Sequence, residues 1–413
     1  MSSLKPATRF VLACIFMDAL GFGLIIPVLP RLIGDLAGTR DLQTYWYGAI
    51  MVSYGIMQFL SSPILGALSD RFGRKPVLLT GIFGLSIMQF VPAFTSSLPL
   101  VLASRIAGGM LSANLVVAQA YIADITPKQQ RSAAFGKIGA VYGLAFVIGP
   151  ALGGILGQID PRIPFAFAGA ICCLNFIYGF FVLPESLTTP DMRPWTFRRF
   201  NPFIGIIALL KVKPIIPMVL IIGLIYLSQS LMQCTWALYT EFRYGWTPLN
   251  IGLSMFVLGL CIAFTQGWLL PALIRVQSEK HLVIAALSIG CLALAGIGFT
   301  TWGIVAAILA WTFSLLGIAS PIIQSAVSRQ VSPTMQGSAM GAISSLNSFS
   351  GAIAPVISTP LLVYTAKGTD ELIPPGIPYY LAASLLLLSV VIALIARRSH
   401  RFLTRSTVNG RFE

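Results

Sequence analysis

Long apolar stretches alternate with short polar connections along almost the whole chain. Each stretch has about 20 residues or more, which is the length that a helix needs to cross the hydrocarbon core of a bilayer. Hydropathy therefore predicts twelve membrane-spanning helices. They cover residues 8–33, 45–68, 76–95, 98–121, 134–157, 163–183, 214–238, 248–271, 281–299, 302–326, 337–362 and 377–396.

The composition excludes several classes of protein. Hydrophobic residues make up 56% of the 413 residues and charged residues 10%, whereas an average soluble domain has about 25% charged residues. This excludes a soluble globular enzyme, a disordered chain and a nucleic-acid-binding protein. The sequence has no nucleophile–base pair, phosphate-binding loop or metal-ligand cluster, and its six cysteines all lie within apolar stretches. We therefore expect no enzymatic activity, no cofactor and no metal site.

The positive charge of the chain follows the predicted topology. The net charge is +14, and most of the 27 Lys and Arg lie in the two tails and in the connections after even-numbered helices. Those on the other face are Arg31, Arg40, Arg162, Arg243 and Lys367. Because cytoplasmic loops of membrane proteins carry an excess of Lys and Arg, both termini are predicted to be cytoplasmic.

The longest polar stretch lies at the midpoint of the chain. We predict an N-terminal six-helix bundle over residues 1–184, a cytoplasmic linker over 185–213, a C-terminal six-helix bundle over 214–397 and a cytoplasmic tail over 398–413. A weak internal repeat supports two related halves, because one sequence interval separates Gly48 from Gly252, Gly55 from Gly259 and Arg71 from Arg275. Secondary transporters are often built this way, with the substrate site between the halves near the bilayer midplane. The predicted fold class is thus an all-α membrane protein.

The connection between the second and third predicted helices reads GALSDRFGRKP. Gly66 and Gly73 permit close helix approach and a tight turn. Asp70 lies near the end of one helix, and Arg71 and Arg74 lead into the next. Such a cluster can lock two helices by charge in one conformation and release them in another. The alternative is a solvated, positively charged loop.

Asp18 in the first predicted helix and Arg105 in the fourth are the ionisable residues placed deep in predicted spans. An ionisable group inside a bilayer is costly, so each is a candidate functional residue with the other as its partner. Burial would favour the neutral acid, whereas a nearby guanidinium would favour the carboxylate. Asp18 is therefore a candidate proton site, and a static structural ion pair is the alternative.

Small residues recur through the fifth predicted helix, which contains GAVYGLAFVIGPALGG over residues 139–154. They let helices pack closely, and a proline can kink the helix because it donates no backbone hydrogen bond. The residues are Gly139, Gly143, Gly149, Pro150, Gly153 and Gly154. Ordinary packing of membrane helices is the alternative.

These motifs resemble the major facilitator superfamily, and within it the twelve-helix drug/proton antiporters and bacterial tetracycline exporters. The similarity extends over most of the chain and is strongest in DALGFGLIIPVLP, MQFLSSPILGALSDRFGRKPVLL and AYIADIT, with shorter matches in GLSM and SRQV. The resemblance implies the major facilitator fold with two pseudo-symmetric halves, and transport driven by a proton gradient without a cofactor.

The resemblance also implies roles for particular residues. Residues 66–76 match the signature loop of the family, and 139–154 match the motif that is found in its antiporters and exporters. Asp18 and Arg105 lie where the exporters have a functional acid and arginine. Asp124, at the end of the fourth helix, would join Asp70 and Arg74 in a network of gating charges.

Two departures from the tetracycline exporters limit what the resemblance implies. Those proteins carry acids within the third and ninth helices and a histidine in the eighth, but the stretches 81–94, 281–299 and 251–270 contain no such acid or histidine within the membrane. The C-terminal counterpart of the signature loop, residues 269–281, lacks the Asp-Arg-x-Gly core. We therefore expect a charge lock in the N-terminal half alone, and tetracycline is not assigned as the substrate.

Polar residues within the predicted helices are candidates for the substrate cavity, which is expected to be apolar with a few orienting polar groups. Gln229 and Gln233 share a helical face, and Trp236 lies on the adjoining turn, so the three could hold an aromatic or amphipathic ligand. For each residue an interhelical hydrogen bond is the alternative. The candidates are Gln58, Asn114, Gln119, Gln229, Gln233, Trp236, Gln266, Gln324 and Asn347.

The sequence thus predicts a proton-coupled antiporter that exports a small, amphipathic, drug-like compound by alternating access. A dedicated transporter of a physiological metabolite, such as a siderophore or an organic anion, is the alternative. A receptor or scaffold would need a larger extramembrane domain than these loops provide. The expected location is a bacterial inner membrane, and the expected partners are substrate, protons and lipid but no nucleic acid. We expect the protein to act as a monomer.

Overall fold

The computed structural model describes residues 4–112, 114–127, 131–187, 207, 215–331, 336–366 and 376–397. These residues are almost entirely helical and contain no strand. Twelve helical segments within them are long and apolar enough to cross a membrane, in agreement with the sequence prediction. Most of the expected linker over 185–213, and the whole expected tail over 398–413, lie outside the described residues.

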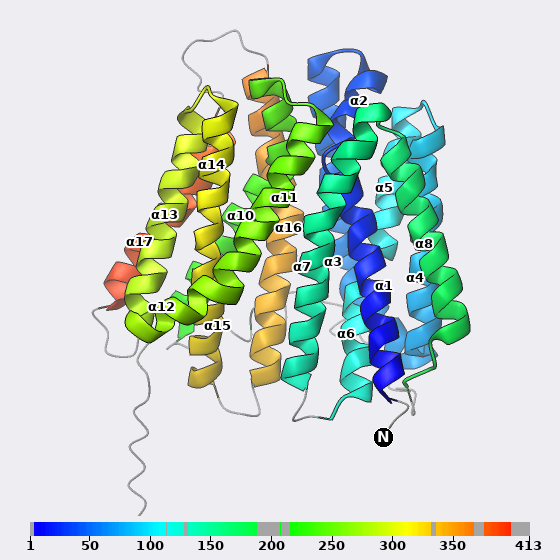
Figure 1. Cartoon of the computed structure of the whole chain (residues 1–413), viewed down its shortest axis with the longest axis horizontal. Helices are drawn as coiled ribbons and strands as arrows, with labels where there is room; N and C mark the ends of the chain where they lie inside the picture. Colours follow the sequence, from blue (N-terminus) through cyan, green and yellow to red (C-terminus); the bar gives the residue numbers. More distant parts are fainter. Residues whose placement is uncertain are drawn as a thin grey trace, which may run out of the picture.

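The helices before the midpoint of the chain are labelled α1 to α8 (Figure 1). They are α1 (Leu4–Ile25), α2 (Leu29–Ala37), α3 (Arg40–Phe72), α4 (Arg74–Phe94), α5 (Leu98–Leu111), α6 (Asn114–Ile125), α7 (Arg131–Ile159) and α8 (Ile163–Val182).

The helices after the midpoint are labelled α10 to α17. They are α10 (Ile216–Tyr244), α11 (Pro248–Phe264), α12 (Leu270–Val276), α13 (Glu279–Phe299), α14 (Gly303–Phe313), α15 (Ala319–Gln330), α16 (Gln336–Ala366) and α17 (Ile377–Arg397).

Two helices that hydropathy predicts as continuous are broken in the structure. The first predicted span divides into α1 and α2 at a turn over residues 26–28. Pro27 lies within this turn, and Pro30 lies in the first turn of α2, where its missing N–H costs nothing. The fourth predicted span divides into α5 and α6, with Ser112 after the first segment and Asn114 at the start of the second.

Two further spans contain irregular segments. A π-helical segment, Thr265–Leu269, joins α11 to α12, and a 3₁₀ segment, Ser314–Ile318, joins α14 to α15. The hydroxyl oxygens of Thr265 and Ser314 lie 3.5 Å apart, so the two irregular segments lie side by side. Segments of this kind inside long helices frequently mark functional sites or hinges.

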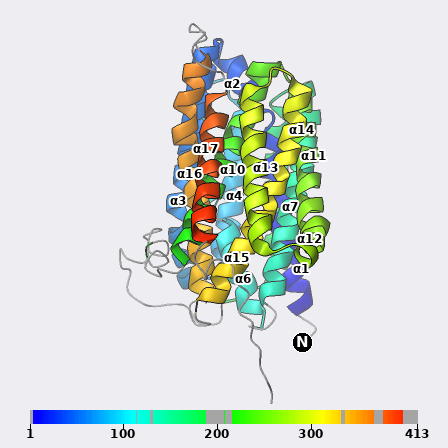
Figure 2. The same ribbon diagram turned by 90° about the vertical axis from the view of Figure 1, so that its left-hand side faces the viewer.

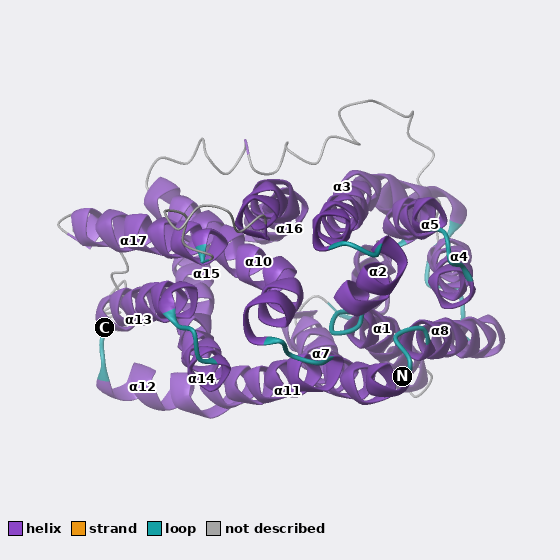
Figure 3. Ribbon diagram, turned by 90° about the horizontal axis from the view of Figure 1, so that it is seen from above, coloured by secondary structure: helices purple, strands orange, loops and turns teal. Residues whose placement is uncertain are grey.

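The helices form two groups, α1–α8 and α10–α17, which Figure 3 shows from above. The groups meet where α7 packs against α11 and where α3 packs against α16. The spans run lengthwise between two faces of the molecule (Figures 1 and 2). We call the end that carries Gly73, between α3 and α4, the loop face, and the end that carries α2 the α2 face.

Glycine permits the close contacts between the groups. A Cβ atom on Gly154 of α7 would lie 2.6 Å from the carbonyl oxygen of Pro248 and 3.1 Å from the Cα atom of Gly252, both in α11. A side chain at Gly154 would therefore push the two halves apart. These contacts lie in the part of the molecule nearer the α2 face.

Candidate transport site

A cavity of about 1290 Å³ lies between the two groups of helices. Its lining comes mainly from α1, α3 and α7 on one side and from α10, α11 and α16 on the other, with further residues from α4, α5, α6 and the π-helical segment. Among the described residues that line it, Asp18 and Arg105 are the charged ones. The rest of the lining is mostly apolar or aromatic, with a small number of carboxamide and hydroxyl groups, which is the composition expected for a binding site for small organic molecules.

Asp18 of α1 is held by Asn114 at the start of α6. The Asn114 side-chain nitrogen donates a hydrogen bond of 3.2 Å to Oδ2 of Asp18. The other carboxylate oxygen, Oδ1, is buried and has no hydrogen-bond partner among the described residues. A buried carboxylate with a single amide donor is costly when ionised, so this carboxyl group is placed to take up a proton or a polar group of a ligand.

Arg105 of α5 lies at the wall of the same cavity. Its guanidinium donates a 2.7 Å hydrogen bond to Oε1 of Gln89 in α4 and lies over the ring of Phe165, with 5.3 Å from Cζ to the ring centroid. Its Nε atom is buried and has no partner among the described residues. A carboxamide and an aromatic ring therefore take the place of an acidic partner.

The expected pairing of Asp18 with Arg105 is absent from the ion pairs of the described residues. Each is hydrogen-bonded to a carboxamide instead, Asp18 to Asn114 and Arg105 to Gln89. The sequence does not indicate Gln89 as the partner of Arg105, because a single glutamine in an apolar helix gives no signal of what it contacts. The structure therefore does not support the alternative of a static ion pair between Asp18 and Arg105.

The structure divides the substrate-cavity candidates into two sets. Those that line the cavity are Gln58, Asn114, Gln229, Gln233, Gln266 and Asn347. Those outside the lining are Gln119, Trp236 and Gln324. Trp236 is buried and donates a 3.0 Å hydrogen bond to the Ser254 hydroxyl, and Gln324 donates one of 2.9 Å to the Tyr226 hydroxyl. Trp236 therefore packs against α11 and does not share the cavity with Gln229 and Gln233.

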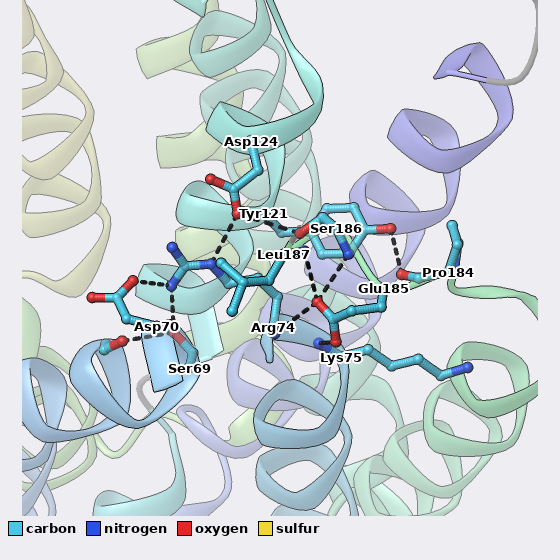
Figure 4. Close-up of polar contacts among 11 residues, drawn as sticks. Ser69, Asp70, Arg74, Lys75, Tyr121, Asp124, Pro184, Glu185, Ser186 and Leu187 are labelled. Atoms are coloured by element: carbon cyan, nitrogen blue, oxygen red, sulfur yellow. Dashed lines mark hydrogen bonds and ion pairs between the residues drawn. The ribbon is translucent and has the colours of Figure 1, made fainter. Parts of the chain in front are cut away.

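Arg74 is the centre of the polar network at the loop face (Figure 4). It contacts Oδ1 of Asp70 at 2.6 Å through Nη1 and Oδ2 of Asp124 at 3.0 Å through Nε, and it donates a 2.7 Å hydrogen bond to Ser69. The network ties together α3, α4 and α6, as the resemblance implies. Arg71 stacks on the adjacent ring of Phe72, 5.9 Å from its centroid.

Glu185, which no sequence motif indicates, anchors the segment after α8 to this network. Its carboxylate accepts hydrogen bonds from the backbone N–H groups of Arg74 (2.9 Å) and Lys75 (3.1 Å), in the first turn of α4. A carboxylate at this end satisfies free N–H donors and the positive end of the helix dipole. Two further contacts fix the segment, because Tyr121 donates to the Pro184 carbonyl and Ser186 to Asp124 (Figure 4).

A second ion pair lies at the loop face of the other half. Arg329 at the end of α15 contacts Glu279 at the start of α13 through Nη2 and Oε2 at 2.6 Å, with a second contact of 3.3 Å. The sequence predicts a charge lock in the N-terminal half alone. The structure corrects this, because Glu279, within residues 269–281, pairs with Arg329 of α15 although the Asp-Arg-x-Gly core is missing.

The halves are joined near the α2 face. Gln43 of α3 donates hydrogen bonds from Nε2 to the Pro30 carbonyl (2.9 Å) and to Oε1 of Glu241 in α10 (3.0 Å). The Tyr47 hydroxyl donates to the carbonyl of Cys234, also in α10, at 2.9 Å. These contacts close the cavity on this side.

The motif in α7 contributes to both the cavity and the closure. Gly139 and Gly143 line the cavity, and a Cβ atom at either would meet nothing within 4 Å. A Cβ atom at Gly149 would meet Gly23 of α1 at 2.9 Å, and Gly153 packs against the backbone of Leu24. The cavity therefore extends toward the loop face along one end of α7, whereas the other end of α7 is packed.

Pro150 lies inside α7 without ending it. A Cβ atom at Gly23 would lie 3.1 Å from the Pro150 Cδ atom, so α1 and α7 pack closely at this point. A proline in a helix leaves one carbonyl without its usual partner and favours bending there. It directly follows Gly149, the first of the packed glycines of the motif.

Comparisons with known proteins agree with this architecture. The model of the Major Facilitator Superfamily matches residues 11–355. The tetracycline resistance protein class C of Escherichia coli is 34% identical over 357 residues, which cover 86% of this chain and 90% of that protein. The quinolone resistance protein NorA of Staphylococcus aureus (strain MSSA476) is 28% identical over 399 residues, covering 94% and 95%.

Among solved structures, the human organic anion transporter MFSD10 (TETRAN) superposes with a TM-score of 0.69 at 24% identity, covering 94% of this chain and 99% of that chain. This likeness supports the fold. The two halves, the twelve candidate spans and the family match together identify a multi-pass membrane transporter. The chain belongs to the major facilitator superfamily.

Proposed function

We propose that the protein is a proton-coupled antiporter that exports a small, amphipathic, drug-like compound across a bacterial inner membrane. The observation that carries the proposal is the position of Asp18, a membrane-embedded acid at the cavity with one oxygen unpartnered among the described residues. The relatives named as tetracycline and quinolone resistance proteins support drug export and do not favour a dedicated metabolite transporter.

In this proposal the loop face is cytoplasmic, both termini lie on that side, and the chain works as a monomer. The excess of Lys and Arg at the loop face supports this orientation, and an even number of spans places the two ends of the chain on one side. The conformation of this structure would then be open to the cytoplasm and closed at the α2 face.

The proposed coupling requires no covalent chemistry and no cofactor. Asp18 releases its proton to the cytoplasm when the cavity opens there, and the substrate then binds. After the halves rearrange, the substrate leaves on the other side and Asp18 is protonated again. Binding of either the proton or the substrate removes the cost of burying an unpaired Asp18 carboxylate while the cavity is closed on both sides. The two bundles, residues 1–184 and 214–397, would move largely as rigid bodies, with the Arg74 network released in one state and formed in the other.

Inside-out membrane vesicles with an acidic interior and a fluorescent pH reporter test the proposal. Tetracycline, a cationic drug, a neutral drug and a polycarboxylate siderophore are added one at a time. Proton efflux triggered by a drug supports drug/proton antiport. No proton efflux with any drug, together with proton efflux on addition of the siderophore, would contradict the proposal and would favour the metabolite transporter.

A further inference from the structure

The two walls of the cavity differ in charge. Asp18 and Arg105, its charged lining residues within the described chain, both belong to the N-terminal half. The wall from the C-terminal half offers carboxamides and hydroxyl groups but no formal charge among its described residues. A ligand that contacts both walls therefore meets ionisable groups on one side and neutral hydrogen-bonding groups on the other.

The carboxamides of the C-terminal wall are Gln229 and Gln233 of α10, Gln266 of the π-helical segment and Asn347 of α16. None makes a side-chain hydrogen bond to another described residue. On the opposite wall Asn114 and Gln89 are both occupied, and Gln58 is the single lining carboxamide there without such a bond among the described residues. The four side chains are therefore free to bind water or a ligand. We call these four residues the carboxamide wall.

The carboxamide wall is arranged to bind polar groups that lie along one edge of a ligand. Gln229 and Gln233 are one helical turn apart, so their Cβ atoms are about 6 Å from each other on the same face. Each carboxamide offers two donors and one acceptor oxygen. Hydroxyl, carbonyl or amide groups along one edge of a ligand can replace the bound water with hydrogen bonds of similar strength. A ligand without such groups would displace the water and leave the carboxamides unpaired, which is costly.

The charges of the other wall limit the net charge of the ligand. Asp18 and Arg105 have opposite signs, so their formal charges cancel when both are ionised. A permanent organic cation would find one carboxylate, which also holds the proton in the proposed function, and would lie near an unneutralised guanidinium. A neutral or zwitterionic molecule meets no such penalty.

We infer that the carboxamide wall is the specificity-determining surface of the cavity, and that the substrate is a neutral or zwitterionic molecule with an edge of uncharged hydroxyl, carbonyl or amide groups. This inference rests on the proposed function for the identity of the cavity as the transport site. It goes further by naming the residues that recognise the substrate and the chemical class of substrate that they bind.

Equilibrium binding to the purified full-length protein tests the inference without a proton gradient. The probes are chloramphenicol, tetracycline in the presence of EDTA, and tetraphenylphosphonium, a permanent cation without hydrogen-bonding groups. We expect at least one of the two polar probes to bind about tenfold more tightly than tetraphenylphosphonium. The polar probes can form hydrogen bonds with the carboxamides, whereas tetraphenylphosphonium cannot. Equal or tighter binding of the cation, or no binding of either polar probe, would overturn the inference.

Variants of the carboxamide wall test whether it causes the preference for the polar probe. Gln229→Leu with Gln233→Leu is expected to weaken binding of the polar probe about tenfold and to change binding of the cation less than twofold. Asn347→Ala provides a second, independent variant. Gln119→Leu is the matched control, because it removes a glutamine from a membrane helix outside the cavity lining. Unchanged binding of the polar probe in both wall variants would contradict the inference.

Binding also separates this inference from the proposed function. Asp18→Asn is expected to keep the preference for polar probes, because the carboxamide wall is unchanged. Loss of proton coupling in the vesicle assay with intact selectivity would support both proposals. Selectivity without any proton coupling in the wild type would contradict antiport and leave the assignment of the wall intact.

Discussion

Glu279 and Arg329 form an ion pair that repeats the pair of Arg74 and Asp124 with the charges exchanged. Glu279 occupies the start of α13, as Arg74 occupies the start of α4, and Arg329 occupies the end of α15, as Asp124 occupies the end of α6. The same sequence interval separates Glu279 from Arg74 and Arg329 from Asp124. Each half thus joins its equivalent pair of helices at the loop face by charge.

Reversing the charges of Glu279 and Arg329 tests whether the two residues act as a pair. Glu279→Arg alone places two cations together and is expected to slow substrate-driven proton flux several-fold, whereas Glu279→Arg with Arg329→Glu restores most of it. The effect is modest because Arg329 is 36% exposed, and partly exposed pairs contribute about 1 kcal/mol or less. Flux in inside-out vesicles measures it. No recovery in the double variant would show that the charges act separately.

Asp70 and Asp124 are expected to control the rate of exchange and not the affinity for substrate. Arg74 is 7% exposed and pairs with both carboxylates. Asp70→Asn or Asp124→Asn therefore weakens the network but leaves Arg74 paired with the other carboxylate. Because neither acid lines the cavity, we expect turnover to fall several-fold with unchanged substrate binding. Asp41→Asn, on the α2 face, is the control. A loss of affinity in either network variant would contradict this account.

Glu185→Gln is expected to destabilise the loop face. The carboxylate accepts four backbone hydrogen bonds, two of them from the first turn of α4, and a neutral amide can replace it only partly. Loss of a helix cap costs about 1 kcal/mol, so thermal unfolding of the purified protein should begin about 1 °C lower. Asp35→Asn, an exposed acid of α2, is the matched control and is expected to change the unfolding temperature little. An equal shift in both variants would argue against the anchor.

Gln43→Ala is expected to loosen the closure at the α2 face, because Gln43 bridges the Pro30 carbonyl and Glu241 across the two halves. Hydrogen–deuterium exchange should rise several-fold in peptides from the first turns of α3 and the last turns of α10. Gln324→Ala removes a glutamine hydrogen bond within one half and provides the control. Unchanged exchange at the α2 face in Gln43→Ala would mean that other contacts maintain the closure.

The fold could be predicted from the sequence because bilayer crossing imposes a simple pattern of apolar length. Hydropathy located all twelve candidate spans, but it could not show that Pro27 breaks the first span or that Thr265–Leu269 is π-helical. Those features depend on local hydrogen bonding, which a count of apolar residues does not report.

The site was predictable where a residue violates the apolar pattern. Asp18 and Arg105 are costly in a bilayer, so each is visible from the sequence, and both line the cavity. Their partners Asn114 and Gln89, and the orientation of Trp236 away from the cavity, depend on how helices distant in sequence are rotated against each other. The carboxamide wall likewise emerges from the placement of α10, α16 and the π-helical segment around the cavity and not from any motif.

The most direct test of the central claim compares wild type with Asp18→Asn in two assays on the same inside-out vesicles, with a substrate identified by its proton response. The account predicts that Asp18→Asn abolishes substrate-driven proton efflux but retains exchange of labelled for unlabelled substrate, which requires no net proton movement. Proton efflux at the wild-type rate in Asp18→Asn would contradict the assignment of Asp18 as the proton carrier.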